Sequence, residues 1–345
     1  MIGVIGAGSF GSAVANLLAE NGAVLIHSKR QEAVDEINQQ HTNKGLLMNP
    51  NIAATTSLEE IANATNILFP AMSSDIFRVT IKQLAPFLSP EHIIIHCTKG
   101  FDIKLNEDES LTDANLQIKL ENVKTMSQVI LEETCVKRVG CMSGPNLARE
   151  LAQFHPAATV IASKFNEVII SGRNAIRSHR LLVYGNKDIY AVELAGVLKN
   201  TMAIAAGALH GLGYGQNALA FLITRGNGEI IKLATKMGAN PTSFLGLAGI
   251  GDLVATCSSP LSRNFSYGYK LSQGKTRDEI LSEMNEVAEG VKTVNICYQL
   301  SKQLKVDTPI INAVYSVVYE NVRVEDALNT LMQQQFSDDV DFLYD

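Results

Sequence analysis

Short apolar runs alternate with helical patterns through the first half of the chain. Runs typical of buried β-strands lie at Ile2–Ile5, Val24–His27, Asn66–Phe69 and His92–Cys97. Between them, helices are predicted at Gly11–Asn21, Gln31–Gln40, Ser57–Asn63 and Asp75–Phe87. Later strands are predicted at Val136–Met142, Ala157–Ala162 and Leu181–Tyr184. This alternation predicts a parallel sheet covered by helices on both faces.

The second half of the chain has few strand signals. Helical patterns occupy Ile189–Gly207, Asn217–Met237, Arg277–Met284, Val291–Leu304 and Val324–Gln334. The change near Gly185-Asn186 predicts a boundary between an α/β domain, residues 1–185, and an all-α domain, residues 186–345. Within the first domain, Ser57 and Glu60 fit a capping box, and the acidic segment Asp102–Asn122 is predicted to be a surface excursion.

A glycine-rich motif follows the first predicted strand. Gly6, Gly8 and Gly11 form G-x-G-x-x-G between an apolar strand and a helical pattern. In this context the motif is typical of a Rossmann-type doubly wound domain, in which the N–H groups at the helix start bind a pyrophosphate. The alternative is an ordinary glycine turn.

The end of the second strand bears on cofactor preference. A site selective for NAD usually has an acidic residue there, which binds the ribose hydroxyl. This chain has Lys29 and Arg30 instead, two cations that suit the 2′-phosphate of NADP. The sequence therefore predicts that NADP or NAD is used and that NADP is favoured. The alternative is that the two charges simply begin a solvated helix.

Composition excludes several classes of protein. The 345 residues are 46% hydrophobic and carry a net charge of −6, so no general attraction for nucleic acid is expected. Five cysteines without a C-x-x-C pair predict reduced thiols and neither a disulfide framework nor a metal site. Charged and polar residues interrupt the richest apolar region, Ala191–Ile223, so no membrane span is predicted. Without a basic leader, a cytoplasmic protein is expected.

Five further segments place polar residues in apolar or glycine-rich surroundings. They are Thr98-Lys99-Gly100, Ser143-Gly144-Pro145-Asn146, Gly196-Val197-Leu198-Lys199-Asn200, Gly249-Ile250-Gly251-Asp252-Leu253 and Ser262-Arg263-Asn264. In this order after the glycine motif, they closely resemble the NAD(P)-dependent glycerol-3-phosphate dehydrogenase family. Further matches are Ile223-Thr224-Arg225-Gly226, Thr256-Cys257 and Glu289-Gly290. The resemblance spans roughly Ile2 to Leu331.

The resemblance implies a catalytic group of Lys199, Lys99 and Asp252. The reaction would be reversible hydride transfer between NAD(P)H and dihydroxyacetone phosphate, giving glycerol-3-phosphate for phospholipid synthesis. Lys199 would remove or return the hydroxyl proton, because a lysine made less basic by burial or by a neighbouring cation can act as a base. Lys99 would hold the substrate oxygen, and Asp252 would orient the lysines.

The same resemblance implies the binding residues. The substrate would contact Lys99, Gly144, Asn146, Lys199, Asn200, Asp252, Thr256, Ser262, Arg263 and Asn264, with Arg263 and Asn264 on its phosphate. The cofactor would contact Gly6, Gly8, Ser9, Phe10, Gly11, Lys29, Arg30, Lys99, Ala148, Arg263, Val287 and Glu289. We expect the active site between the two domains, with the nicotinamide facing Lys199, and a homodimer is one option for the assembly.

Single residues of this group also have structural interpretations. Lys199 alone would be read as a lysine that reaches the surface, Asp252 as a helix N-cap, and Arg263 as the partner in a surface ion pair. Two functional rivals are a related hydroxyacid or 6-phosphogluconate dehydrogenase and an inactive nucleotide sensor. The chain also departs from the family pattern at Pro70–Phe77, Asp102–Asn122, Asn146-Leu147 and His155–Ala158.

Overall fold

The computed structural model describes residues 1–104, 118–284, 289–334 and 338–340. It contains two compact units: Met1–Asp102 with Lys124–Glu193, and Ile103–Val123 with Leu194–Asp345. The third change between the units falls at Glu193–Leu194, inside a helix. The domain boundary after residue 185 stays a prediction, and most of the predicted excursion Asp102–Asn122 lies outside the described residues.

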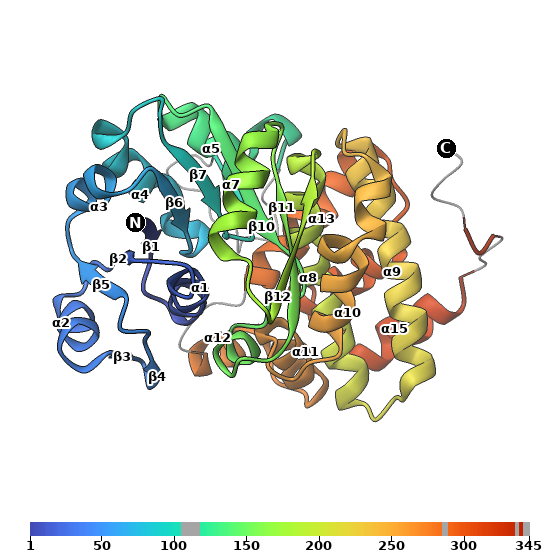
Figure 1. Ribbon diagram of the computed structural model, residues 1–345. Coiled ribbons are helices and arrows are strands. Elements are labelled where there is room, and N and C mark those ends of the chain that lie inside the picture. Colours follow the sequence, from blue (N-terminus) through green and yellow to red (C-terminus); the bar gives the residue numbers. More distant parts are fainter. Residues whose placement is uncertain (105–117, 285–288, 335–337, 341–345) are drawn as a thin grey trace. The chain divides into compact units, whose positions relative to one another are not determined.

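An eight-stranded sheet forms the centre of the first unit (Figure 1). Its strands are β1 (Ile2–Ile5), β2 (Val24–His27), β5 (Ile52–Thr55), β6 (Ile67–Pro70), β7 (Ile93–His96), β10 (Arg138–Ser143), β11 (Ala157–Ala162) and β12 (Leu181–Asn186). Their order is β12-β11-β10-β7-β6-β1-β2-β5, and every pairing is parallel except that of β10 with β11. The chain winds outward from β1 in both directions, which confirms the predicted doubly wound sheet.

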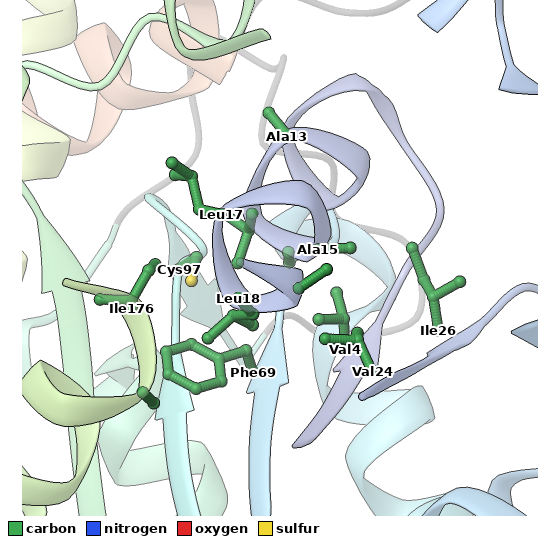
Figure 2. Close-up of a cluster of buried hydrophobic side chains, with 14 of the residues drawn as sticks. Val4, Ala13, Ala15, Leu17, Leu18, Val24, Ile26, Phe69, Cys97 and Ile176 are labelled. Carbon is green, nitrogen blue, oxygen red and sulfur yellow. The ribbon is translucent and has the colours of Figure 1, made fainter. Parts of the chain in front are cut away.

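Helices cover both faces of this sheet. One face packs against α1 (Ser9–Ala19), α2 (Gln31–Gln40) and α7 (Asn166–Ile176), while the other carries α3 (Leu58–Ala64), α4 (Ser74–Leu84) and α5 (Met126–Glu133). Figure 2 shows Leu17 and Leu18 of α1 lying over Val4 and Phe69 of the sheet, all of them at most 2% exposed. Full burial of each large side chain contributes roughly 1.5–3 kcal/mol. This core fixes α1 against β1 and therefore fixes the glycine loop that joins them.

The remaining elements of this part of the chain are short. They are β3 (Thr42–Asn43), β4 (Leu46–Leu47), β8 (Phe101–Ile103), β9 (Val123–Thr125), α6 (Ala148–Ala152) and the 3-10 turns Ala85–Phe87 and Leu120–Asn122. The sequence patterns missed β5, α5 and α7. The strand β5 reads Ile-Ala-Ala-Thr, and alanine has a low strand propensity, so its identity as a strand depends on pairing with β2.

The capping box predicted for α3 is only half correct. The Ser57 hydroxyl accepts the N–H of Glu60 at 3.1 Å, as expected for an N-cap. The Glu60 carboxylate does not reach back to Ser57; it accepts the Thr55 hydroxyl instead, and Thr55 in turn accepts the N–H of Ser57 at 3.0 Å. Thr55 ends β5 and is buried, so the tertiary position of that strand redirects the glutamate.

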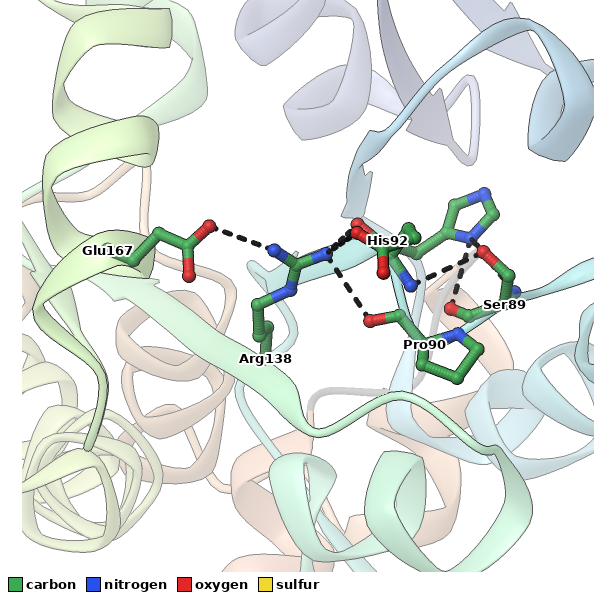
Figure 3. A network of polar contacts seen from close by, with 6 residues as sticks. Ser89, Pro90, His92, Arg138 and Glu167 are labelled. Atoms are coloured by element: carbon green, nitrogen blue, oxygen red, sulfur yellow. Dashed lines mark hydrogen bonds and ion pairs between the residues drawn. The ribbon is translucent and has the colours of Figure 1, made fainter.

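Polar contacts hold the amino ends of β7 and β10 (Figure 3). The Arg138 guanidinium at the start of β10 binds the Glu167 carboxylate at 2.8 Å and the Pro90 carbonyl at 3.3 Å. His92, just before β7, contacts the Ser89 N–H at 2.9 Å through Nδ1. These bonds satisfy backbone groups at the sheet edge opposite the carboxyl ends, where ligands of open α/β sheets bind. We therefore assign this network to stability.

The second unit is helical, as predicted. Its elements are α8 (Ile189–Gly211, from Leu194 onward), α9 (Gln216–Lys236), 3-10 turn Pro241–Leu245, π-helix Leu247–Gly251, α10 (Asp252–Cys257), α11 (Arg263–Ser272), α12 (Arg277–Glu283), α13 (Glu289–Leu304), α14 (Pro309–Tyr319) and α15 (Val324–Met332). The sequence patterns missed α10, α11 and α14. Helices α8 and α11 pack backbone against backbone at Gly268. A Cβ at this position would overlap the Ile204 carbonyl oxygen, so the close approach requires glycine.

One described helix, α8, is long and apolar enough to cross a membrane by length and composition alone. In the structure, 89% of that apolar window is buried inside the protein. Buried core helices of soluble proteins meet the same criterion, so the helix is weak evidence for a membrane span, and the predicted absence of a span stays a prediction.

A buried carboxyl group holds the start of α14. Glu229 on α9 accepts the N–H groups of Ile310 at 2.7 Å and Ile311 at 3.0 Å, where no side chain of Thr308 caps the helix. Burial raises the pKa of Glu229 to about 8 from its ordinary 4.5, although the two N–H groups lower it. The folded state therefore binds more protons than the unfolded state between these two values.

We expect Glu229→Gln to remove this pH dependence. Because the folded pKa is the higher one, the contribution of Glu229 to stability is full below pH 4.5 and declines as pH rises toward 8. The slope is at most about 1.4 kcal/mol per pH unit. Urea unfolding of the wild type and the variant at pH 5.5 and 8 measures the difference. If the free energy of unfolding of the wild type did not fall relative to that of Glu229→Gln as pH rises, this assignment would be wrong.

Candidate active site

The glycine loop joins β1 to α1 at the carboxyl edge of the sheet. Gly6 has a φ of +111°, a conformation that favours glycine, and a Cβ there would lie 2.8 Å from the Ala71 carbonyl oxygen. A Cβ on Gly11 would overlap the Gly6 carbonyl oxygen, so these two positions let helix and loop touch. The loop is therefore built as the sequence predicted.

The first turn of α1 presents backbone donors. Gly8 is the N-cap and offers no side chain to cap the helix, and the first intrahelical bond is from Ser12 N–H to Gly8 O at 2.9 Å. The N–H groups of Ser9, Phe10 and Gly11 have no acceptor within the helix by its geometry. Open space surrounds the Cα of Gly8, since a Cβ there would have no neighbour within 4 Å. These donors and the helix dipole fit the pyrophosphate of NAD(P).

Lys29 and Arg30 lie exposed just beyond β2, which pairs with β1. Arg30 is the N-cap of α2, and its N–H donates to the Ser28 hydroxyl at 3.2 Å. Burial lowers the pKa of the neighbouring His27, and Lys29 acts in the same direction, so this ring is neutral at pH 7. Two exposed cations at the carboxyl edge can receive a phosphate, and both lie where helix α2 begins.

Two predicted substrate residues meet beyond β7 and β10. The Lys99 ammonium donates to the Gly144 carbonyl at 3.2 Å. The Asn146 amide donates to the Thr159 hydroxyl at 2.7 Å, and its Oδ1 is buried with no partner among the described residues. Lys99 and Gly144 thus lie next to each other at the carboxyl edge of the sheet, in the first unit.

The second unit contains a buried catalytic candidate. The Lys199 ammonium on α8 lies 3.2 Å from Asp252 Oδ1 and donates to the Thr256 hydroxyl, which itself donates to the Asp252 carbonyl at 2.6 Å. Lys199 and Asp252 are 5% and 2% exposed. The interpretation of Lys199 as a lysine that reaches the surface is therefore wrong. Asp252 is not a helix N-cap either, since that position belongs to Gly251.

A π-helical turn places Asp252. Leu247–Gly251 forms this turn directly before α10, whose first residue is Asp252. Such turns are rare and concentrate at functional sites, because they redirect side chains at the helix junction. Cys257 ends α10, and burial raises the pKa of its thiol to about 12, with Lys199 lowering it. The thiol is therefore neutral at pH 7, and Lys199 is the candidate for proton transfer.

The predicted phosphate clamp lies at the start of α11. The Ser262 hydroxyl caps this helix by accepting the Phe265 N–H at 3.3 Å, and exposed Arg263 is its first residue. The buried Asn264 accepts the Gly290 N–H at 3.0 Å, next to Glu289 at the start of α13. A guanidinium beside a helix N-terminus suits a phosphate group.

The other predicted residues take simpler positions. Asn200 is 5% exposed on α8, beside Lys199. Ala148 begins α6 and is half-buried, and Ser9 and Phe10 lie in the first turn of α1. Val287 lies outside the described residues. Near the Pro70–Phe77 segment, Ser73 is the N-cap of α4, but no contact assigns it a role in cofactor binding.

No group of three or more potential metal ligands occurs among residues whose placement is described. All five cysteines are unpaired as thiols, and only Cys135 is exposed. The predicted absence of a metal stays a prediction.

Comparisons with known proteins identify the family of this chain. Residues 1–169 match the family model of the NAD-dependent glycerol-3-phosphate dehydrogenase N-terminus, and residues 188–329 match that of the C-terminus. Glycerol-3-phosphate dehydrogenase [NAD(P)+] of Staphylococcus haemolyticus is 40% identical over 339 residues, covering 96% of this chain and 97% of the relative. The Staphylococcus aureus protein of the same name is 40% identical over 338 residues, covering 96% and 98%.

Solved structures give the same result. Glycerol-3-phosphate dehydrogenase from Coxiella burnetii superposes with a TM-score of 0.84 at 28% identity, covering 96% of this chain and 98% of that one. A ketopantoate reductase from Ralstonia eutropha, with a TM-score of 0.56 and 12% identity over 96% of this chain and 100% of that one, shares the fold alone. The chain belongs to the NAD-dependent glycerol-3-phosphate dehydrogenase family.

Proposed function

We propose that Lys199 transfers the proton in the NAD(P)-dependent interconversion of glycerol-3-phosphate and dihydroxyacetone phosphate. The observation that carries this proposal is the buried contact of Lys199 with Asp252 and Thr256. Bound NAD(P)H supplies the hydride. As the substrate carbonyl carbon receives it, the oxygen becomes an alkoxide and takes a proton from the Lys199 ammonium; the reverse reaction returns that proton to a neutral lysine.

Asp252 and Thr256 prepare Lys199 for this step. Thr256 directs its hydroxyl hydrogen to the Asp252 carbonyl, so its oxygen lone pair faces the Lys199 Nζ. The Asp252 carboxylate compensates the buried ammonium charge. The direction of the Nζ–H bonds is therefore set before substrate binds, which reduces the reorganisation that proton transfer requires.

The substrate groups farther from the reacting carbon have their own proposed contacts. Arg263, Ser262 and Asn264 at the start of α11 bind the phosphate, while Lys99, Gly144, Asn146 and Asn200 position the three-carbon unit. Binding energy from a remote phosphate can hold the reacting carbon in hydride-transfer geometry. The physiological direction we propose is reduction, which forms glycerol-3-phosphate for phospholipid synthesis.

Steady-state assays test the proposed function directly. We expect the wild type to oxidise NADPH and NADH with dihydroxyacetone phosphate and to ignore small 3-hydroxy acids offered with NADP. Turnover of a hydroxyacid but not of the triose phosphate would favour the rival dehydrogenase. Cofactor binding without turnover of either would favour an inactive nucleotide sensor.

We propose that Lys29 and Arg30 make NADP the favoured cofactor, with Ser9, Phe10, Ala148, Val287 and Glu289 as further cofactor contacts. Replacing both Lys29 and Arg30 by Ala should raise KM for NADPH by roughly tenfold or more, because charge-assisted hydrogen bonds to the 2′-phosphate are lost. KM for NADH should stay within about twofold, since NADH lacks that phosphate. Equal changes with both cofactors would assign the two cations to general surface charge.

We also propose that the enzyme acts in the cytoplasm as a homodimer on small-molecule substrates, without a nucleic-acid partner. The apolar helices of the second unit are the only sequence support for the dimer. Light scattering coupled to size exclusion measures the mass, and a monomeric mass at assay concentration would reject that part of the proposal.

A further inference from the structure

A small hairpin packs against the glycine loop and α1 within the first unit. Strands β3 and β4 pair through Thr42↔Leu47 and Asn43↔Leu46, joined by Lys44 and Gly45. Both turn residues have positive φ angles, 52° and 76°, which is typical of a two-residue hairpin turn. Two buried asparagines connect this hairpin region to α1, and they do so in different ways.

Asn43 binds the glycine loop itself. Its side-chain Nδ2 donates to the Ala7 carbonyl at 3.0 Å and to the Ser12 hydroxyl at 2.7 Å. Asn43 and Ser12 are each 1% exposed. Because a carbonyl oxygen only accepts, the amide nitrogen must face Ala7. The Asn43 amide thus donates its two hydrogens to Ala7, directly before Gly8, and to Ser12 in the first turn of α1.

This contact has a consequence for the next peptide group. The Ala7 carbonyl and the Gly8 N–H belong to one planar trans peptide, so they point in opposite directions. Holding the Ala7 oxygen against Asn43 turns the Gly8 N–H away from the hairpin. Glycine has little intrinsic preference between backbone orientations, so without an external contact this peptide can rotate readily.

We propose that Asn43 is a positioning residue that orients the Ala7–Gly8 peptide so that the Gly8 N–H faces the cofactor pyrophosphate. The inference rests on the proposed role of the glycine loop. Asn43 touches neither substrate nor cofactor; it acts through the peptide it holds. Asn43 therefore affects binding of the pyrophosphate, which NADH and NADPH share, and not binding of the 2′-phosphate.

Asn16 provides the matched control. It lies on α1, is 7% exposed, and also makes two bonds to the hairpin region: it donates to the Leu47 carbonyl and accepts the Asn49 N–H, each at 2.9 Å. Neither partner belongs to the glycine loop. Asn16→Ala therefore loosens the attachment of the same hairpin without releasing the Ala7–Gly8 peptide.

The experiment measures Kd for NADH and NADPH by fluorescence titration, together with Tm and kcat at saturating cofactor. Asn43→Ala should raise both Kd values by the same factor, roughly tenfold, because a hydrogen bond to a charged phosphate is weakened. Its kcat should stay within about twofold, since proton transfer does not use this loop. Asn16→Ala should lower Tm and leave both Kd values unchanged.

Asn43→Asp keeps the side-chain size, turns an acceptor toward the Ala7 oxygen and adds negative charge, so it should weaken binding more than Asn43→Ala. Asn43→Ser, which adds no charge and keeps one hydroxyl donor, replaces the alanine variant if that variant does not fold. Wild-type Kd values in the Asn43 variants would overturn the inference. So would an equal rise in Kd for Asn16→Ala at equal loss of Tm. A wild type that binds neither cofactor would instead refute the proposed function.

Discussion

Lys199→Ala is expected to lower kcat for dihydroxyacetone phosphate reduction by roughly 10²–10⁴-fold, the usual contribution of a positioned proton donor. The Lys199 ammonium is buried and held by Asp252 and Thr256, so its loss leaves no other group of that cluster able to donate a proton in the same direction. Kd for NADPH should change little, because the proposed pyrophosphate donors lie on α1.

Two further variants sharpen this test. Lys199→Arg keeps the positive charge but does not lose a proton at accessible pH, so it should be impaired almost as severely. Lys232→Ala on α9 removes a half-buried lysine of the same unit outside the proposed site and should leave kcat within about twofold. If Lys199→Ala kept more than a tenth of the wild-type kcat, Lys199 would not be the proton donor.

Arg263→Ala is expected to raise KM for dihydroxyacetone phosphate by roughly 10–100-fold, because charge-assisted hydrogen bonds to a phosphate contribute about 1.5–3 kcal/mol. Arg263 is the first residue of α11, where the helix dipole also favours an anion. Arg263→Ala is therefore expected to weaken binding of the substrate phosphate and to leave the chemistry at the reacting carbon unchanged.

A substrate without phosphate provides the control for Arg263. Dihydroxyacetone lacks the group that Arg263 is proposed to bind, so Arg263→Ala should leave its low kcat/KM unchanged within about twofold. Arg277→Ala, at the start of neighbouring α12, should not change KM for either substrate. An equal loss with dihydroxyacetone and its phosphate would show that Arg263 supports the fold or the cofactor instead.

The chemistry of this protein was largely readable from the order of its motifs. The glycine motif after an apolar strand predicted the doubly wound sheet, because the tight turn and close helix packing restrict those positions to glycine. The succession of Lys99, Lys199 and Asp252 in characteristic segments predicted the family to which the chain belongs. Such motifs are local, so a linear pattern can carry them.

Only the tertiary structure decided what depends on contacts between distant segments. The alanine-rich β5 becomes a strand by pairing with β2, and the Glu60 carboxylate accepts the hydroxyl of buried Thr55 in place of the predicted bond to Ser57. Lys199 proved to be buried because α10 brings Asp252 and Thr256 against α8. Asn43, in a stretch for which the sequence predicted no element, contacts Ala7 because it lies in a hairpin too short to produce a strand pattern. Motifs fix the backbone locally, whereas the partners of buried polar groups are set by packing, which no local pattern encodes.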